Sequence, residues 1–88
     1  MKKQRCIDAE LRREVGYKVR TVRTFLDMSL EEMASKVNLS QPTLSNYERG
    51  KYMPTVDFLY KLTTMVNVTI DDFVNLDTKK FVEKVYFG

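Results

Sequence analysis

The sequence predicts an all-α fold of five helices followed by a short C-terminal tail. Apolar residues recur at steps of three and four along most of the chain, as they do on one face of a helix. Good N-cap residues stand immediately before these apolar segments. The length of 88 residues fits a single domain.

The first predicted helix runs from about residue 8 to residue 28. Glycine is a weak helix former, so we expect Gly16 to loosen the first half of this helix. The apolar face repeats at steps of four and then three, through Ile7, Leu11, Val15, Val19, Val22 and Leu26.

Two short helices follow, joined by a tight turn. Ser29 and Glu32 have the spacing of a capping box ahead of the first of them. Asn38 suits a left-handed turn, and Ser40 is a good N-cap for the next helix, which ends at Gly50. A link of about three residues forces a sharp angle, so this segment predicts a helix-turn-helix unit.

Two further helices and a tail complete the prediction. Thr55 caps one apolar segment, and Thr69 with Asp72 caps the next. Residues 77–88 have helical apolar spacing, although residues 85–87 could instead form a short strand. The apolar side chains of the tail either cover the domain's own core or pair with a second subunit, and we favour the subunit contact; they are Phe81, Val82 and Val85.

The composition argues against several classes of function. The single cysteine, Cys6, favours a reducing, cytoplasmic setting. The absence of histidine removes the commonest general base and the commonest metal ligand. No phosphate-binding glycine loop or carboxylate cluster is present, so we expect no enzyme and no cofactor. No apolar run reaches the length of a membrane span, and the N-terminus lacks a signal-peptide pattern.

The net charge of +3 is unevenly distributed and mildly favours a polyanionic partner. Residues 54–88 hold four basic residues against five acids, whereas residues 1–28 hold eight against four. The eight are Lys2, Lys3, Arg5, Arg12, Arg13, Lys18, Arg20 and Arg23.

The second helix of the predicted unit carries short, uncharged polar side chains where a surface helix usually carries Lys and Glu. Such side chains let a helix approach the base edges in the major groove of DNA. There Gln or Asn can bond the N6 and N7 of adenine, and a Thr methyl or a Pro ring can contact the methyl of thymine. The alternative is that Gln41 and Asn46 are ordinary solvated residues. The residues predicted to face the bases are Gln41, Pro42, Thr43, Ser45 and Asn46, and those predicted to reach phosphates after the helix are Arg49, Lys51 and Tyr52.

Residues 15–74 resemble the Cro/repressor type of helix-turn-helix protein, a group of phage repressors and small bacterial regulators. The similar segments are SLEEMA, SQPTLSNYERGK, PTVDFL and VTIDDF, in the order and spacing of that family. The resemblance implies a lambda-repressor-like fold of five helices and a dimer that binds a two-fold symmetric operator in double-stranded DNA. It makes residues 15–76 the DNA-binding domain, with residues 1–14 extending its first helix and residues 77–88 as a tail.

The resemblance also assigns roles to individual residues. It implies base reading by Gln41, Pro42 and Asn46 with Thr43 and Ser45 beside them, phosphate contacts by Ser29, Ser40, Arg49 and Lys51, and an ion pair of Arg23 with Glu48. The sequence departs from the family at two positions. Asn38 replaces the turn glycine, which is tolerable, and Leu30 replaces a glutamine, which puts one phosphate or neighbouring side-chain contact in doubt.

Two functions are therefore considered. The first is a dimeric transcriptional repressor in the cytoplasm, with no membrane association. The alternative is an antitoxin or another protein-binding module that also binds DNA, with residues 77–88 contacting the protein partner.

Overall fold

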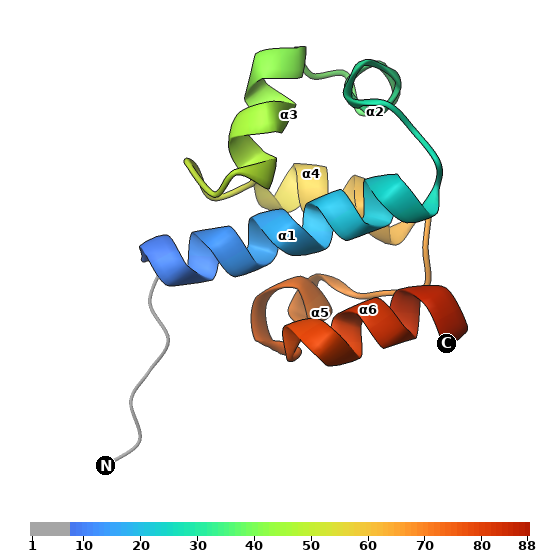
Figure 1. Cartoon of the computed structure of the whole chain (residues 1–88). Coiled ribbons are helices and arrows are strands. Elements are labelled where there is room, and N and C mark those ends of the chain that lie inside the picture. The colour runs from blue at the N-terminus through green and yellow to red at the C-terminus, as the bar shows by residue number, and fades with distance from the viewer. Residues whose placement is uncertain (1–7) are drawn as a thin grey trace.

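The computed structural model describes residues 8–88, which form six helices and no strand (Figure 1). The predicted all-α fold is confirmed, but the tail is a sixth helix, so the alternative of a strand at residues 85–87 is wrong. Cys6 and Ile7 lie outside the described residues. The helices are α1 (Ala9–Phe25), α2 (Leu30–Lys36), α3 (Gln41–Glu48), α4 (Val56–Thr63), α5 (Ile70–Asn75) and α6 (Thr78–Phe87).

Helix α1 runs through the middle of the molecule. Figure 1 shows α2 and α3 on one side of it and α5 and α6 on the other. The apolar residues of α1 span a wide arc, and α1 packs against α3, α5 and α6. None of the helices in residues 8–88 combines the length and the apolar character that a bilayer crossing requires.

Helix α1 begins as predicted but ends three residues early. The side chain of Asp8 caps it by accepting a hydrogen bond from the backbone N–H of Leu11 at 2.9 Å. The helix stops at Phe25, not at Met28, because Asp27 adopts a left-handed conformation with φ of 57°. The chain then turns toward α2.

Gly16 does not loosen α1, contrary to the prediction; it permits close packing. A Cβ atom at this position would lie 2.4 Å from the carbonyl oxygen of Tyr47 and 2.7 Å from that of Glu48. These distances are far below van der Waals contact, so only glycine lets the backbone of α3 approach α1 this closely.

Helix α6 covers the domain's own core. Phe81 is fully buried, Val85 is nearly so, and the rings of Phe81 and Phe73 lie 5.0 Å apart between centroids. These two side chains therefore cannot pair with a second subunit, and the favoured interpretation of the tail is wrong for them. Val82 is only half-buried.

Lys18 is buried, although the sequence places it among the basic residues of the N-terminal segment. Only 1% of its surface is exposed. Its Nζ donates to the carbonyl oxygens of Asp72, Phe73 and Leu76, at the end of α5, and lies 5.6 Å from the centroid of the Phe81 ring. A cation is favourable at a helix C-terminus, so Lys18 joins α1 to α5 and α6.

Candidate nucleic-acid interface

A capped turn sets the angle between α2 and α3. Asn38 has a φ of 61°, the left-handed conformation that the sequence predicts. Its N–H donates to the carbonyl of Ser35 at 3.2 Å, and the N–H of Leu39 donates to the carbonyl of Ala34 at 2.8 Å. These two bonds form a Schellman motif, which ends α2 and redirects the chain into α3.

Helix α2 begins with the predicted capping box. The Ser29 hydroxyl accepts a hydrogen bond from the backbone N–H of Glu32 at 3.0 Å, and the Glu32 carboxylate accepts one from the N–H of Ser29 at 2.8 Å. At the other end of α2, Nζ of Lys61 on α4 donates to the carbonyl oxygen of Val37 at 3.2 Å. Both ends of the short helix are therefore fixed.

Helix α3 begins with a second predicted cap. The hydroxyl of Ser40 accepts from the backbone N–H of Thr43 at 3.2 Å and lies 2.8 Å from the Thr43 hydroxyl. Pro42 lies in the first turn, where its missing N–H costs no helical hydrogen bond.

The predicted base-reading side chains lie on the outer part of α3. Leu44 and Tyr47 are buried and fix the inner face. At 100° per residue, positions 42, 45, 46 and 49 share the opposite face, and positions 41 and 43 lie at its two edges. Gln41 and Pro42 are exposed, whereas Thr43, Ser45 and Asn46 are half-buried.

Asn46 already has a partner on this face. Its Oδ1 accepts a hydrogen bond from Nη2 of Arg49 at 2.9 Å. Bidentate recognition of adenine uses the amide oxygen of Asn as an acceptor and the amide nitrogen as a donor. The amide oxygen has a second lone pair, so Arg49 can keep this bond and orient the Asn46 amide while Oδ1 also accepts from adenine. Nothing in the sequence pattern indicated this contact.

Arg23 and Glu48 form a two-pronged ion pair between α1 and α3. Nε of Arg23 lies 2.7 Å from Oε2 of Glu48, and Nη2 lies 3.1 Å from Oε1. Their side chains are only 16% and 7% exposed. A third bond joins Nη1 of Arg23 to the carbonyl oxygen of Met28 at 2.9 Å, so this guanidinium holds the end of α3 and the start of the α1–α2 link.

The predicted phosphate-contacting residues lie at the ends of the two short helices. Ser29 and Ser40 are exposed caps whose hydroxyls already serve the helices. Arg49, Lys51 and Tyr52 are exposed after α3, with Nζ of Lys51 lying 5.8 Å from the centroid of the Tyr52 ring.

Arg12 ties this segment to α1. Its Nε donates to the carbonyl oxygen of Gly50 at 3.1 Å. Gly50 has a φ of 75°, as expected for a glycine that ends a helix. The basic character of residues 1–28 therefore overstates the free positive charge, because Arg12, Lys18 and Arg23 serve the fold.

Residues 8–88 contain no group of three potential metal ligands. What they present is a capped helix pair with an exposed polar face and cationic side chains at one end. This arrangement defines the class of helix-turn-helix proteins, in which the second helix of the pair enters the major groove of DNA.

The chain belongs to the helix-turn-helix family, whose model matches residues 19–73, more than half of the chain. This match confirms the predicted family and agrees with the lambda-repressor-like all-α fold. The family comprises transcription regulators and is not an enzyme family, in agreement with the expectation from the composition.

Several regulators are similar to this chain over most of its length. An uncharacterized HTH-type transcriptional regulator of Archaeoglobus fulgidus is 30% identical over 67 residues, which cover 76% of this chain and 94% of the relative. A second such regulator of the same organism is 32% identical over 63 residues, which cover 72% and 90%. The HTH-type transcriptional regulator ImmR of Bacillus subtilis is 33% identical over 63 residues, which cover 72% of this chain and 50% of ImmR.

Proposed function

We propose that the protein is a sequence-specific DNA-binding transcriptional regulator that acts as a dimeric repressor on an inverted-repeat operator. The observation that carries the proposal is the outer face of α3, where uncharged polar side chains stand on a helix whose ends and angle are fixed. Membership of the helix-turn-helix family supports it, as do the relatives named as transcriptional regulators. Such a role implies a cytoplasmic location, where DNA is accessible.

In this proposal the side chains of α3 divide between bases and phosphates. Gln41 and Asn46 hydrogen-bond base edges, while Pro42, Thr43 and Ser45 make the close contacts beside them. Within α3 itself, from Gln41 to Glu48, this face carries neither Arg nor Lys, so the contacts of the helix favour A·T pairs over the Arg–guanine pair. Ser29, Ser40, Arg49, Lys51 and Tyr52 set the register on the phosphates.

A two-fold dimer would present two copies of α3 to successive major grooves on one side of the duplex. The half-sites should then lie about one helical turn, roughly 34 Å, apart. Such a site reads as an inverted repeat because the symmetry of the operator mirrors that of the protein.

The test is selection of duplexes from a random pool by the purified protein at about 150 mM salt, followed by titration on the selected sequence at several salt concentrations. We expect an inverted repeat with A·T-rich half-sites, a nanomolar dissociation constant and a steep loss of affinity with salt. A pool that yields no preferred sequence, with only weak salt-sensitive binding, would contradict the proposal. That result would favour the alternative of a protein-binding module.

A further inference from the structure

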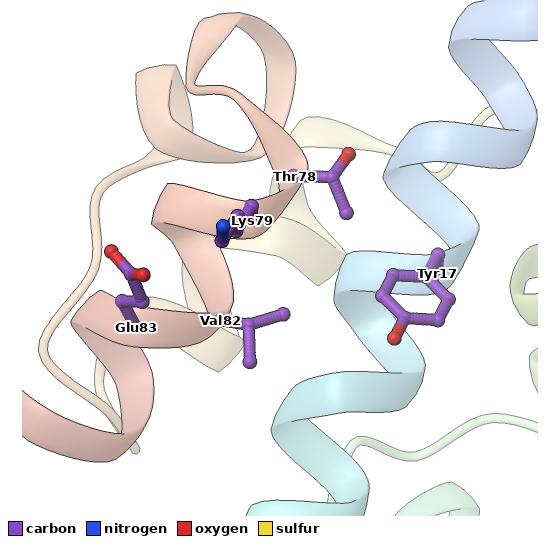
Figure 2. A pocket seen from close by; sticks show the side chains of 5 residues that line it. All are labelled: Tyr17, Thr78, Lys79, Val82 and Glu83. Carbon is purple, nitrogen blue, oxygen red and sulfur yellow. The ribbon is translucent and has the colours of Figure 1, made fainter.

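A hollow with two adjoining parts lies between α1 and α6, on the other side of α1 from α3 (Figure 1). Its larger part has a volume of about 720 Å³ and is mostly apolar. In Figure 2, Thr78 and Val82 project from α6 toward Tyr17 on α1. Lys79 and Glu83 of α6 complete the lining of this part. A volume of this size lies within the range of ~300–1,000 Å³ that is usual for small-molecule sites.

The smaller part of the hollow is polar. Its volume is about 190 Å³, and it shares Tyr17 and Val82 with the larger part. The other residues that line it are Arg20, Thr21 and Thr24 of α1 and Tyr86 of α6. The positions on α1 are three, four and seven residues from Tyr17, so they lie on one face of the helix. The hollow therefore joins an apolar part to a polar part along the same two helices.

The positive charge of the hollow is concentrated in the polar part. Arg20 is exposed there, and it forms no hydrogen bond or ion pair with any of residues 8–88. Among the described residues that line this part, Arg20 alone carries a full charge. In the larger part Lys79 and Glu83 lie one helical turn apart and carry opposite charges, so that part has no net charge.

We infer that the α1–α6 hollow binds a small amphiphilic anion, a carboxylate that carries an aliphatic chain. The guanidinium of Arg20 offers paired N–H donors that match the two oxygens of a carboxylate. The hydroxyls of Thr24 and Tyr86 line the same part and can donate to the same group. The carboxylate therefore lies at Arg20, and Glu83 disfavours the reverse orientation by repulsion.

The aliphatic chain of the ligand occupies the larger part of the hollow. There it covers the ring of Tyr17, which is 53% exposed, and the half-buried Val82, and this burial of apolar surface favours binding. From Thr78 to Tyr86, α6 advances about 12 Å at ~1.5 Å per residue. An extended chain advances about 1.2 Å per bond, so roughly ten carbon atoms span this length.

The first test uses decanoate as the probe, below the concentration at which it forms micelles. Two control ligands separate head from chain: decyltrimethylammonium keeps the chain and reverses the charge, and propionate keeps the carboxylate and loses most of the chain. A titration followed by ¹H–¹⁵N correlation spectra of the 10.4 kDa chain should shift the signals of residues 17–24 and 78–86. We expect a dissociation constant on the order of 0.1 mM for decanoate, and binding at least about tenfold weaker for both controls.

The second test removes the charge that holds the carboxylate. Arg20→Gln should raise the dissociation constant of decanoate about five- to tenfold and should not weaken the binding of decyltrimethylammonium. Arg13→Gln is the matched control, because Arg13 is exposed on α1 and does not line the hollow. It should leave both constants unchanged.

The third test shortens the apolar wall. Tyr17→Ala should raise the dissociation constant of decanoate about tenfold, whereas Tyr60→Ala should not change it, because Tyr60 is 60% exposed on α4 and lies outside the hollow. Far-UV circular dichroism checks that each variant is folded.

Three results would overturn the inference. The first is equal affinity for decanoate and decyltrimethylammonium, or no effect of Arg20→Gln, which would mean unspecific apolar binding. The second is an absence of shifts up to millimolar decanoate. The third is signals of residues 17–24 and 78–86 that change with protein concentration and not with decanoate, which would mean that a second copy covers the hollow.

The inference does not depend on the DNA-binding function proposed above. The hollow and α3 lie on different sides of α1, and none of the variants changes a residue of α3 (Figure 1). A protein that binds decanoate as expected but selects no DNA sequence would support the ligand site and contradict the proposed function. The opposite pair of results would overturn the ligand site alone.

Discussion

At the scale of single residues, Asn46 and Arg49 are coupled before any DNA is bound. Arg49 donates to the amide oxygen that Asn46 would need for adenine. Because an amide oxygen can accept two hydrogen bonds, Arg49 can hold the orientation of Asn46 while Asn46 reads a base in the proposed complex.

We predict that Gln41→Ala and Arg49→Ala weaken DNA binding in different ways. Loss of Gln41 should cost about 1–3 kcal/mol and relax the preference at one base position. Loss of Arg49 should weaken binding to all sequences alike and reduce the salt slope by about 1.

The measurement is titration of the selected duplex and its single-base variants at several salt concentrations. Lys80→Ala, which removes an exposed charge on α6, is the control and should leave both the sequence preference and the slope unchanged. An equal loss on every sequence for Gln41→Ala would mean that Gln41 only positions the backbone.

Gly16 provides a second prediction at the scale of single residues. It concerns whether alanine at this position raises or lowers the free energy of unfolding. Replacing a helical glycine by alanine usually stabilises a helix by up to ~1 kcal/mol. Here the new methyl would meet the carbonyl oxygens of Tyr47 and Glu48, so Gly16→Ala should lower the free energy of unfolding by about 1–3 kcal/mol. Urea denaturation measures this change in the free energy of unfolding. A variant that is more stable than the wild type would show that α3 can move away from α1 without lowering the stability.

At the scale of elements, the first three helices end in the same way. Asp27, Asn38 and Gly50 each adopt a positive φ, with values of 57°, 61° and 75°. At each of the three, the next residue donates to a carbonyl five positions back, as in a Schellman motif. Three sharp and well-defined helix ends keep the short α2 and α3 at fixed angles to α1.

The start of α5 is tied to α6 through one carboxylate. Asp72 accepts hydrogen bonds from the backbone N–H of Thr69 at 2.9 Å and from Nζ of Lys84 at 2.6 Å. Partial burial disfavours the charged carboxylate, but the hydrogen bonds and charge of Lys84 and the bonds from Thr69 outweigh it, and the pKa of Asp72 is lowered below its usual value. Asp72 therefore binds its proton less readily in the folded state than in the unfolded chain.

We predict that the contribution of Asp72 to stability disappears in acid. A group whose pKa is lowered on folding stabilises the folded state above its unfolded pKa, near 3.9, and loses that effect as the pH falls through its folded pKa. Asp72→Asn should therefore lower the free energy of unfolding by about 1–2 kcal/mol at pH 7 and by progressively less below about pH 4.

Urea denaturation across this pH range measures the difference. The neighbouring Asp71→Asn is a matched control, because Asp71 is exposed and, among residues 8–88, bonds only Asn75 of its own helix. It should change the stability by less than ~0.5 kcal/mol. If the difference in the free energy of unfolding between the wild type and Asp72→Asn stayed constant down to about pH 3, the charge of Asp72 would not be the source of the stabilisation.

At the scale of the whole molecule, α1 connects two halves. The α2–α3 pair lies on one side with the proposed DNA-reading face, and α5 and α6 lie on the other (Figure 1). Each half is tied to a cation of α1: the mostly buried Arg23 bonds Glu48 of α3, and the fully buried Lys18 bonds carbonyl oxygens at the end of α5.

We predict that removing residues 78–88 destabilises the monomer itself, and does not merely prevent dimerisation. The truncation deletes the fully buried Phe81 and the nearly buried Val85, and uncovers Phe73 and Lys18. Loss of a buried Phe side chain alone typically costs about 3–5 kcal/mol. Thermal unfolding of the truncated chain should show a large fall in Tm relative to the full chain.

The helix starts and the recognition helix could be predicted from the sequence because their signals are local. Ser29 with Glu32, Asn38, and Thr69 with Asp72 each act within a few residues of chain. The features that could not be predicted depend on contacts with another helix that is distant in the sequence. The sequence shows that Gly16 weakens a helix in isolation, but not that α3 presses on it.

The same limit explains the errors for the tail and for the basic residues. An apolar face on α6 must be buried, but its spacing does not say against which partner. Lys18 reads as a surface charge until three carbonyl groups from a distant helix end surround it. The contacts of Asn46 and of the phosphate-facing residues with DNA remain predictions.

Because Lys18 is buried, its chemical modification would report when α5 and α6 separate from α1. An acylating reagent modifies a lysine only when the amine is exposed to solvent, and this amine is enclosed by carbonyl groups from α5. Lys80, exposed on α6, should therefore acquire the label at once, and Lys18 only when α5 and α6 separate from α1. Mass spectrometry of the peptides that contain Lys18 and Lys80 would measure the two labelling rates. The rate at Lys18 would report how often α5 and α6 separate from α1.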